Sequence, residues 1–269
     1  MFDLPLFAYI LVFAQIVLEV LPVSSTGHLK LIKLFFNLQS FAGLDVLLDC
    51  VNLVSDFVVG LFFLNKTHFK LFSLKPHIIK ETLNSGSVFI TYAIVSNACT
   101  AFIYLLLDRY SCSSLSLIYG FAISFLLVSS SYFKDRFFDN KIESLDLKKA
   151  LIIGVFQSLA ICFRGVSRFG TTFVVARWLN LNVVESLFFT FIMHAQISCA
   201  ILFHHFLSGK LVLILDFLKD PILWAWLLLG GIASYIFLLF VFELAVARKF
   251  YFFSFVYLFS IILLLKSCF

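Results

Sequence analysis

The stretch EVLPVSSTGHL, residues 19–29, sets a run of polar side chains in the middle of an apolar segment that extends from Leu4 to Phe36. The stretch RGVSRFG, residues 164–170, interrupts a second apolar segment, 150–181, in the same way. Each segment is long enough to cross a bilayer, which takes about 20 apolar residues. Polar, non-helical backbone is tolerated at membrane depth only where protein buries it or where it lines a wet cavity. We therefore predict two re-entrant helical hairpins, 4–36 and 150–181, with the polar clusters at their tips.

The composition places the whole chain in a membrane. Hydrophobic residues make up 62% of the 269 residues and charged residues only 13%, with a mean hydropathy of +1.06. A soluble domain is about 45–50% apolar and about 25% charged, so soluble enzymes and disordered chains are excluded. The net charge of +5 is modest and scattered, so we expect no nucleic acid as a partner. The six cysteines have no CxxC spacing, and neither a zinc site nor a disulfide framework is indicated.

Between and after the two hairpins, apolar runs predict membrane spans. There are six of them: Leu44 to Leu64, Leu83 to Leu107, Ser114 to Phe133, Ser186 to Leu207, Ile222 to Ala247 and Tyr251 to Leu265. The predicted fold class is an all-α integral membrane protein with six transmembrane helices and two re-entrant helical hairpins. We expect one membrane domain, 1–269.

The two polar clusters also resemble each other. Val23, Ser24 and Gly27 match Val166, Ser167 and Gly170 at one constant offset, and each cluster is followed by an apolar arm and three spans. Because three is odd, the second half must lie upside down relative to the first. Inverted repeats whose broken helices meet near the midplane are a recurring membrane architecture. We predict an inverted-topology repeat, with repeat one at 1–133 and repeat two at 150–269.

Lysine and arginine set the expected orientation, because they accumulate in cytoplasmic loops. With the N-terminus outside, the inside segments 65–82, 134–149 and 248–250 carry four, five and two basic residues. The outside segments and the arm of the first hairpin carry six in all. Both termini are therefore expected outside.

The tips hold the residues that could carry chemistry, since an ionisable residue within a membrane segment indicates function by default. The first tip offers Glu19, Ser24, Ser25, Thr26 and His28, and the second offers Ser167, Arg168, Thr171 and Thr172. A guanidinium suits phosphate oxygens, and helix N-termini with Gly27 and Gly170 beside them can bind anions. Ser25 and His28 are spaced i, i+3 and share a helical face. A hydroxyl, an imidazole and a carboxylate are the parts of nucleophilic phosphoryl transfer, which suggests a lipid-borne phosphate as substrate.

Structural alternatives exist for these residues. Helix capping alone could account for Ser24, Ser25 and Thr26, and Arg164 is as readily an interfacial cation as a ligand. We interpret His194 as interfacial or structural.

EVLPVSSTGHL resembles the first motif of the bacitracin-resistance type of undecaprenyl-diphosphate phosphatase, and GVSRFGTT, residues 165–172, is similar to the second motif of that family, P-G-x-S-R-S-G-A-T. The likeness covers most of the chain in order. It implies hydrolysis of a polyprenyl diphosphate to the monophosphate lipid carrier and phosphate, which recycles the carrier for peptidoglycan synthesis and confers bacitracin resistance. It also implies a multi-pass protein of the bacterial inner membrane, with membrane lipids as partners and an active site that opens to the outer face. A homodimer is one assembly that the sequence leaves open.

The motifs and the resemblance together give the candidate residues. The catalytic candidates are Glu19, Ser25, His28 and Arg168, and the substrate-binding candidates are Ser24, Thr26, Gly27, Arg164, Gly165, Ser167, Gly170, Thr171 and Thr172. Ser25 is expected to attack the terminal phosphorus, or to position a water that does so, with His28 or Glu19 as base. A transporter or flippase of the same carrier is the alternative function, because inverted repeats also suit alternating access.

Departures from the family pattern bear on the metal. Gln15 stands where the family has a second glutamate, Arg164 where it has proline, Phe169 where it has serine, and Gln196 where it has proline. We expect Glu19 to help bind a divalent cation, Mg²⁺ or Ca²⁺, with substrate phosphates completing the coordination shell.

The orientation can be tested by single cysteines introduced into a cysteine-depleted chain. Cysteines in segments 65–82 and 134–149 should react only with reagent applied from the cytoplasm, and cysteines between Ser208 and Asp220 only with reagent applied from outside. Labelling of 65–82 and 134–149 from opposite sides of the membrane would contradict the inverted repeat.

Overall fold

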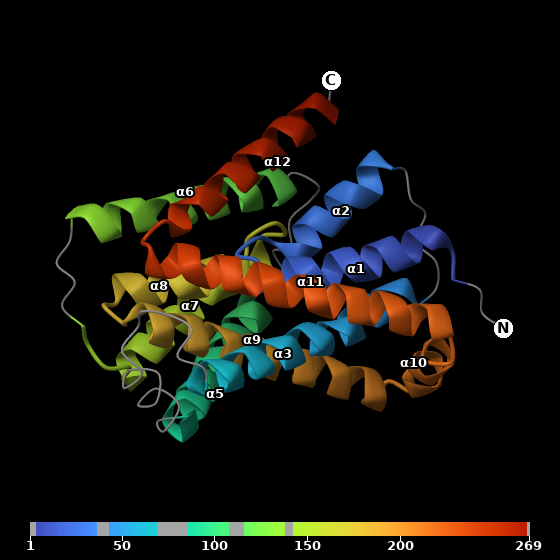
Figure 1. Ribbon diagram of the computed structural model, residues 1–269. Coiled ribbons are helices and arrows are strands. Elements are labelled where there is room, and N and C mark those ends of the chain that lie inside the picture. The colour runs from blue at the N-terminus through green and yellow to red at the C-terminus, as the bar shows by residue number, and fades with distance from the viewer. Residues whose placement is uncertain (1–3, 37–42, 69–85, 108–115, 138–141, 268–269) are drawn as a thin grey trace.

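The structure is a computed structural model that describes residues 4–36, 43–68, 86–107, 116–137 and 142–267. Helices make up the described chain, which contains no strand (Figure 1). They are α1 (Leu6–Val20), α2 (Ser25–Phe35), α3 (Leu44–His68), α5 (Gly86–Leu107), α6 (Ser116–Phe137), α7 (Leu147–Cys162), α8 (Arg168–Trp178), α9 (Val183–Leu207), α10 (Leu211–Phe217), α11 (Pro221–Val246), a 3₁₀ turn (Phe250–Phe253) and α12 (Ser254–Ser267). The predicted all-α class is confirmed.

Five helices within the described ranges are long and apolar enough to cross a membrane: α3, α5, α6, α9 and α11. They coincide with five of the six predicted spans, within a few residues at the ends that the structure describes. The sixth predicted span, Tyr251 to Leu265, falls on the 3₁₀ turn and α12, which together form a shorter apolar element. As a full crossing, the sixth span stays a prediction.

Both interrupted apolar segments fold as two helices with a break at the polar cluster. The first gives α1 and α2, separated by residues 21–24, and the second gives α7 and α8, separated by residues 163–167. The two breaks use the same cap: Ser24 Oγ accepts the Gly27 N–H at 3.2 Å, and Ser167 Oγ accepts the Gly170 N–H at 2.9 Å. Such a cap satisfies one of the N–H groups that the first turn of a helix leaves unpaired.

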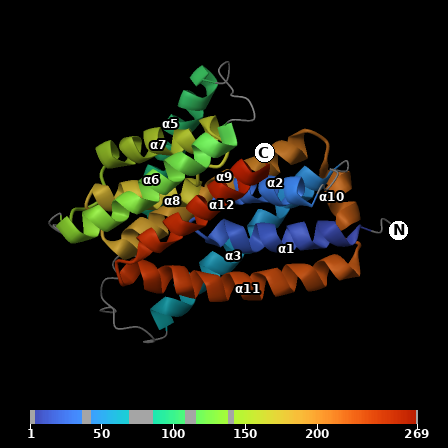
Figure 2. The ribbon, with the colours of Figure 1, turned by 90° about the horizontal axis from the view of Figure 1, so that it is seen from above.

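The helices of one half pack against those of the other. In both views α1 runs beside α11 and α7 beside α5 (Figures 1 and 2). Further contacts between the halves join α3 with α9, α5 with α9, α3 with α11, α6 with α8 and α2 with α12. Because α7, α8, α9, α11 and α12 follow one another as α1, α2, α3, α5 and α6 do, each of these contacts has a counterpart when the halves are exchanged.

The two breaks lie directly against each other. A Cβ added to Gly27 would stand 2.9 Å from Gly165 Cα, and one added to Gly170 would stand 3.3 Å from the Pro22 carbonyl oxygen. Gly165 also has a φ of +100°, which a residue with a side chain rarely adopts. Glycine is therefore needed where the two tips meet, and it lets the polar clusters of both halves share one site.

Gly120 of α6 sets the position of the second break. A Cβ at Gly120 would lie 2.0 Å from the Arg164 carbonyl oxygen and 2.7 Å from its carbonyl carbon. We expect Gly120→Ala to lower the melting temperature in detergent strongly, because the obstacle is backbone, and overpacking alone typically costs about 1–3 kcal/mol. Gly60→Ala is the control, since nothing lies within 4 Å of the added Cβ. Equal melting temperatures for the two variants would contradict the close contact between α6 and the break.

Candidate active site

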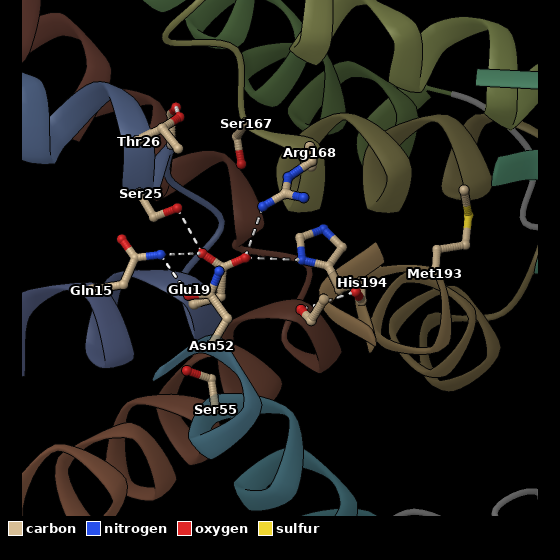
Figure 3. A network of polar contacts seen from close by, with 12 residues as sticks. Gln15, Glu19, Ser25, Thr26, Asn52, Ser55, Ser167, Arg168, Met193 and His194 are labelled. Atoms are coloured by element: carbon tan, nitrogen blue, oxygen red, sulfur yellow. Dashed lines mark hydrogen bonds and ion pairs between the residues drawn. The ribbon is translucent and has the colours of Figure 1, made fainter. Parts of the chain in front are cut away.

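A single carboxylate lies at the centre of the site. Glu19, 6% exposed near the end of α1, accepts a hydrogen bond from Ser25 Oγ to its Oε2 at 2.6 Å. Its other oxygen, Oε1, accepts from Arg168 Nη2 at 3.0 Å (Figure 3). Gln15 Nε2 lies 3.4 Å from Oε2 and donates to Asn52 Oδ1 at 2.5 Å. Glu19 therefore joins the two tips through residues 149 positions apart in the chain.

Two helices begin at this carboxylate. Ser25 is the first residue of α2 and Arg168 the first residue of α8. The N-terminus of a helix carries a partial positive charge and N–H groups without helical partners, so it favours anions. Together with the guanidinium, the two N-termini make this place suitable for a phosphoryl group. Three of the predicted catalytic residues, Glu19, Ser25 and Arg168, thus lie in contact through the carboxylate.

His194 of α9 is a site residue that sequence reasoning missed. Its Nδ1 lies 3.7 Å from Glu19 Oε1, on the same oxygen that Arg168 binds (Figure 3). The ring is 5% exposed, packs edge-on against Phe169, and its Nε2 has no partner among the described residues. A lone histidine inside an apolar span gives no sequence signal, because its neighbours come from distant segments.

His28 lies on α2 with Ser25, and its ring nitrogens contact other residues. Its Nδ1 is 2.7 Å from the Ser24 carbonyl oxygen and its Nε2 is 3.0 Å from Ser260 Oγ of α12. The ring packs on Phe121 and Tyr257, with centroids 5.0 Å and 6.2 Å away. In this arrangement His28 joins the first tip to α12, and both ring nitrogens are engaged by Ser24 and Ser260. Its role as base stays a prediction.

The other predicted residues fall into three groups. Ser24, Ser167, Gly27, Gly165 and Gly170 shape the two breaks through the caps and close contacts described above. Thr171 and Thr172 are buried in α8, and neither hydroxyl has a partner among the described residues. Thr26 and Arg164 are exposed and line cavities.

Two polar cavities adjoin the tips. The smaller, about 30 Å³, is lined by Glu19, Ser25, Arg168 and His194 among others, and we call it the inner cavity. The larger, about 480 Å³, we call the vestibule. Its lining consists of Gln15, Thr26, Leu29, Lys30, Lys33, Asp45, Leu48, Asp49 and Arg164. Thr26 borders both cavities, so the vestibule and the inner cavity are adjacent.

The donor set for a divalent cation is small. In the described part of the chain no group of three histidine, cysteine or acidic residues is arranged to hold a metal. Glu19 is the carboxylate of the inner cavity, and the Oε1 of Gln15, one turn earlier on α1, is buried without a partner in the described chain. A carboxylate and an amide oxygen fit a hard cation that takes its remaining ligands from substrate phosphates and water.

Fold and site together define a multi-pass, all-helical membrane protein whose ion-paired polar centre lies between two broken helices. Residues 8–263 match the family described as "Bacitracin resistance protein BacA", and the chain belongs to this family.

Curated relatives agree with this assignment. The chain is 31% identical over 194 residues to undecaprenyl-diphosphatase 3 of Bacillus cereus, covering 69% of this chain and 68% of the relative. It is 29% identical over 196 residues to an undecaprenyl-diphosphatase of Methanosphaera stadtmanae, covering 65% and 67%. It is 28% identical over 224 residues to an undecaprenyl-diphosphatase of Leptospira interrogans, covering 76% and 79%.

Proposed function

We propose that this protein is an undecaprenyl-diphosphate phosphatase, which releases phosphate from the lipid diphosphate and returns the monophosphate carrier to peptidoglycan synthesis. The observation that carries the proposal is the joint contact of Ser25 and Arg168 with the Glu19 carboxylate, at 2.6 Å and 3.0 Å. It sets a hydroxyl, a base and a fixed cation around one cavity. The family and the names of the relatives support the same activity, and bacitracin resistance follows from the family description.

The mechanism begins at Ser25. Its hydroxyl already donates to Glu19, so the carboxylate takes the proton as Oγ bonds to the terminal phosphorus. The bond from that phosphorus to the bridging oxygen breaks, and its electron pair stays on the leaving polyprenyl phosphate. Water then attacks the phosphoserine, and the bond from Ser25 Oγ to phosphorus breaks as Glu19 returns its proton to Oγ. Free phosphate leaves with one proton of the water, and the other passes to solvent, so Glu19 is again a carboxylate. Arg168 and the first N–H groups of α8 stabilise the negative charge on the phosphoryl oxygens.

His194 has a supporting part in this mechanism. By lying beside Oε1, it helps Arg168 hold the carboxylate with its second oxygen turned to Ser25. A neutral imidazole can do this without cancelling the charge that Glu19 needs as a base. The proton acceptor in this proposal is therefore Glu19, and His28 maintains the shape of the tip.

A divalent cation, Mg²⁺ or Ca²⁺, is part of the proposal. When bound, it would neutralise charge on the diphosphate, with Glu19 and the amide oxygen of Gln15 as its protein ligands. The unpartnered, buried Oε1 of Gln15 supports this donor set.

The topology is proposed as well. The matched helix contacts of the two halves and the identical serine caps support an inverted repeat in one membrane domain. Six spans with two re-entrant hairpins then place the tips at membrane depth, in the bacterial inner membrane, with the vestibule open to the outer face. An apolar cavity of about 660 Å³ between α3, α9, α10 and α11 supports a lipid-borne substrate.

The activity is tested by phosphate release from a polyprenyl diphosphate by the purified protein, with Arg168 as the diagnostic residue. Arg168→Ala is expected to lower kcat by about 10²–10³-fold, the cost of removing one charge-stabilising donor. Arg168→Lys should restore little, because a point charge cannot replace the planar fork that holds Glu19 and phosphate. The control is Lys219→Ala, which removes an exposed cation that is distant from Arg168 in the sequence. Wild-type rates in Arg168→Lys would show that guanidinium geometry is not used.

The metal is tested by titrating the divalent cation in the same assay. Gln15→Glu adds a second carboxylate beside Glu19, so we expect the metal concentration for half-maximal rate to fall. Glu19→Gln removes both the base and the charged ligand and should nearly abolish turnover. Full activity in excess chelator would contradict a required metal and would assign charge neutralisation to the arginines.

A further inference from the structure

The vestibule contains cations that the mechanism above does not use. Its two acids already have partners: Asp45 pairs with Lys33 at 3.3 Å, and Asp49 Oδ2 lies 2.9 Å from His205 Nε2. Within the described ranges neither Lys30 nor Arg164 forms an ion pair. The vestibule therefore has two cations available for an anion that enters it.

These two cations come from both tips. Lys30 lies one helical turn after Thr26 on α2, so the two share a face. Arg164 belongs to the break before α8, next to Gly165, which touches Gly27. The same tip-to-tip contact that joins Ser25 and Arg168 at the inner cavity thus brings Lys30 and Arg164 to the vestibule beside it. The two cavities share Thr26, and each has cationic side chains of its own.

We infer that the vestibule is a second phosphate subsite, in which Lys30 and Arg164 bind the lipid-proximal phosphate of the diphosphate while the inner cavity takes the terminal one. This inference rests on the proposed function. Two phosphates that share one bridging oxygen must occupy adjacent places, as these two cavities do. A guanidinium and an ammonium both suit phosphate oxygens.

The subsite affects the chemistry at the leaving group. When the bond between the terminal phosphorus and the bridging oxygen breaks, the electron pair remains with the proximal phosphate, which becomes more negative. Cations fixed around this phosphate stabilise that charge in the transition state. A monophosphate ester bound with its phosphorus in the inner cavity has no phosphate for the vestibule, so Lys30 and Arg164 would make the enzyme selective for diphosphates.

Two inhibitors distinguish the subsites. Farnesyl phosphate, a short analogue of the lipid product, offers a phosphate to the vestibule, whereas inorganic phosphate offers one to the inner cavity. Hydrolysis of farnesyl diphosphate at fixed divalent cation is followed by chromatography of the lipid product, which is unaffected by added phosphate. The variants are Lys30→Gln and Arg164→Gln, which keep polar side chains. The control is Lys219→Gln, which removes an equal charge from an exposed lysine outside the lining of the vestibule.

We expect Lys30→Gln and Arg164→Gln each to raise the inhibition constant of farnesyl phosphate about tenfold, the usual size of one charge-assisted contact. The inhibition constant of inorganic phosphate should stay the same, and Lys219→Gln should change neither constant. The effect of Lys30→Gln and Arg164→Gln should shrink at high salt. Unchanged inhibition by farnesyl phosphate would overturn the subsite, and so would an equal rise for both inhibitors.

A wild-type protein that releases no phosphate would count against the proposed function alone. Farnesyl phosphate binding can then be measured directly by calorimetry on the same variants. Weaker binding to Lys30→Gln and Arg164→Gln would support the subsite without turnover, and equal binding would overturn it.

Discussion

A carboxylate inside a membrane protein is stable only if its charge is matched and its oxygens are hydrogen-bonded, and Glu19 imposes this condition on the whole fold. The matching charge, Arg168, comes from the other half of the chain, so the halves must close on each other before the carboxylate can be buried. For Arg168 Nη2 to lie 3.0 Å from Glu19 Oε1, the backbones of the two tips must come into contact, which Gly27 and Gly165 permit. Removing either charge would leave the other buried and unpaired, which is the costly case for an ion pair. The ion pair of Glu19 and Arg168 therefore holds the two halves together and also forms the centre of the site.

The breaks must also satisfy their own backbone groups, and the last helix of each half does this for the opposite tip. At the first tip, Tyr257 Oη of α12 donates to the Pro22 carbonyl at 2.6 Å, and Ser260 of the same helix contacts His28. At the second tip, Ser124 of α6 accepts the Ser167 N–H at 3.0 Å and donates to the Gly165 carbonyl at 3.3 Å. Polar backbone is thus bound by protein hydroxyls, as the interior of a bilayer demands. This explains why α12 and α6 carry polar residues on otherwise apolar faces.

Sequence reasoning reached the features that follow from local patterns. Long apolar runs located five helices, and polar residues inside two other apolar runs located both breaks. The likeness of the two polar clusters placed Glu19 and Arg168 at one site, but it did not predict their ion pair. It did not reach contacts made across the fold. The partners of His194 and Asn52 come from distant segments. Only the packing of α9 against α3 and α8, and of α3 against α1, brings these two residues to Glu19 and Gln15. For His28, helical spacing gave a shared face with Ser25 but could not give the partner, which lies 232 residues away on α12.

The two tips share a scaffold but differ in chemistry at matched positions. Ser24 and Ser167 cap their helices in the same way, and Gly27 and Gly170 follow each cap at the same spacing. The next position after the cap differs: α2 begins with the hydroxyl of Ser25 and α8 with the guanidinium of Arg168. At the constant offset of the repeat, Glu19 corresponds to Cys162, so one half alone supplies a carboxylate. A symmetric pair of tips would place like groups against each other, two cations, two hydroxyls or two carboxylates. Because the halves diverged at these positions, a single base lies between a nucleophile and a cation, and a repeated scaffold holds one asymmetric reaction centre.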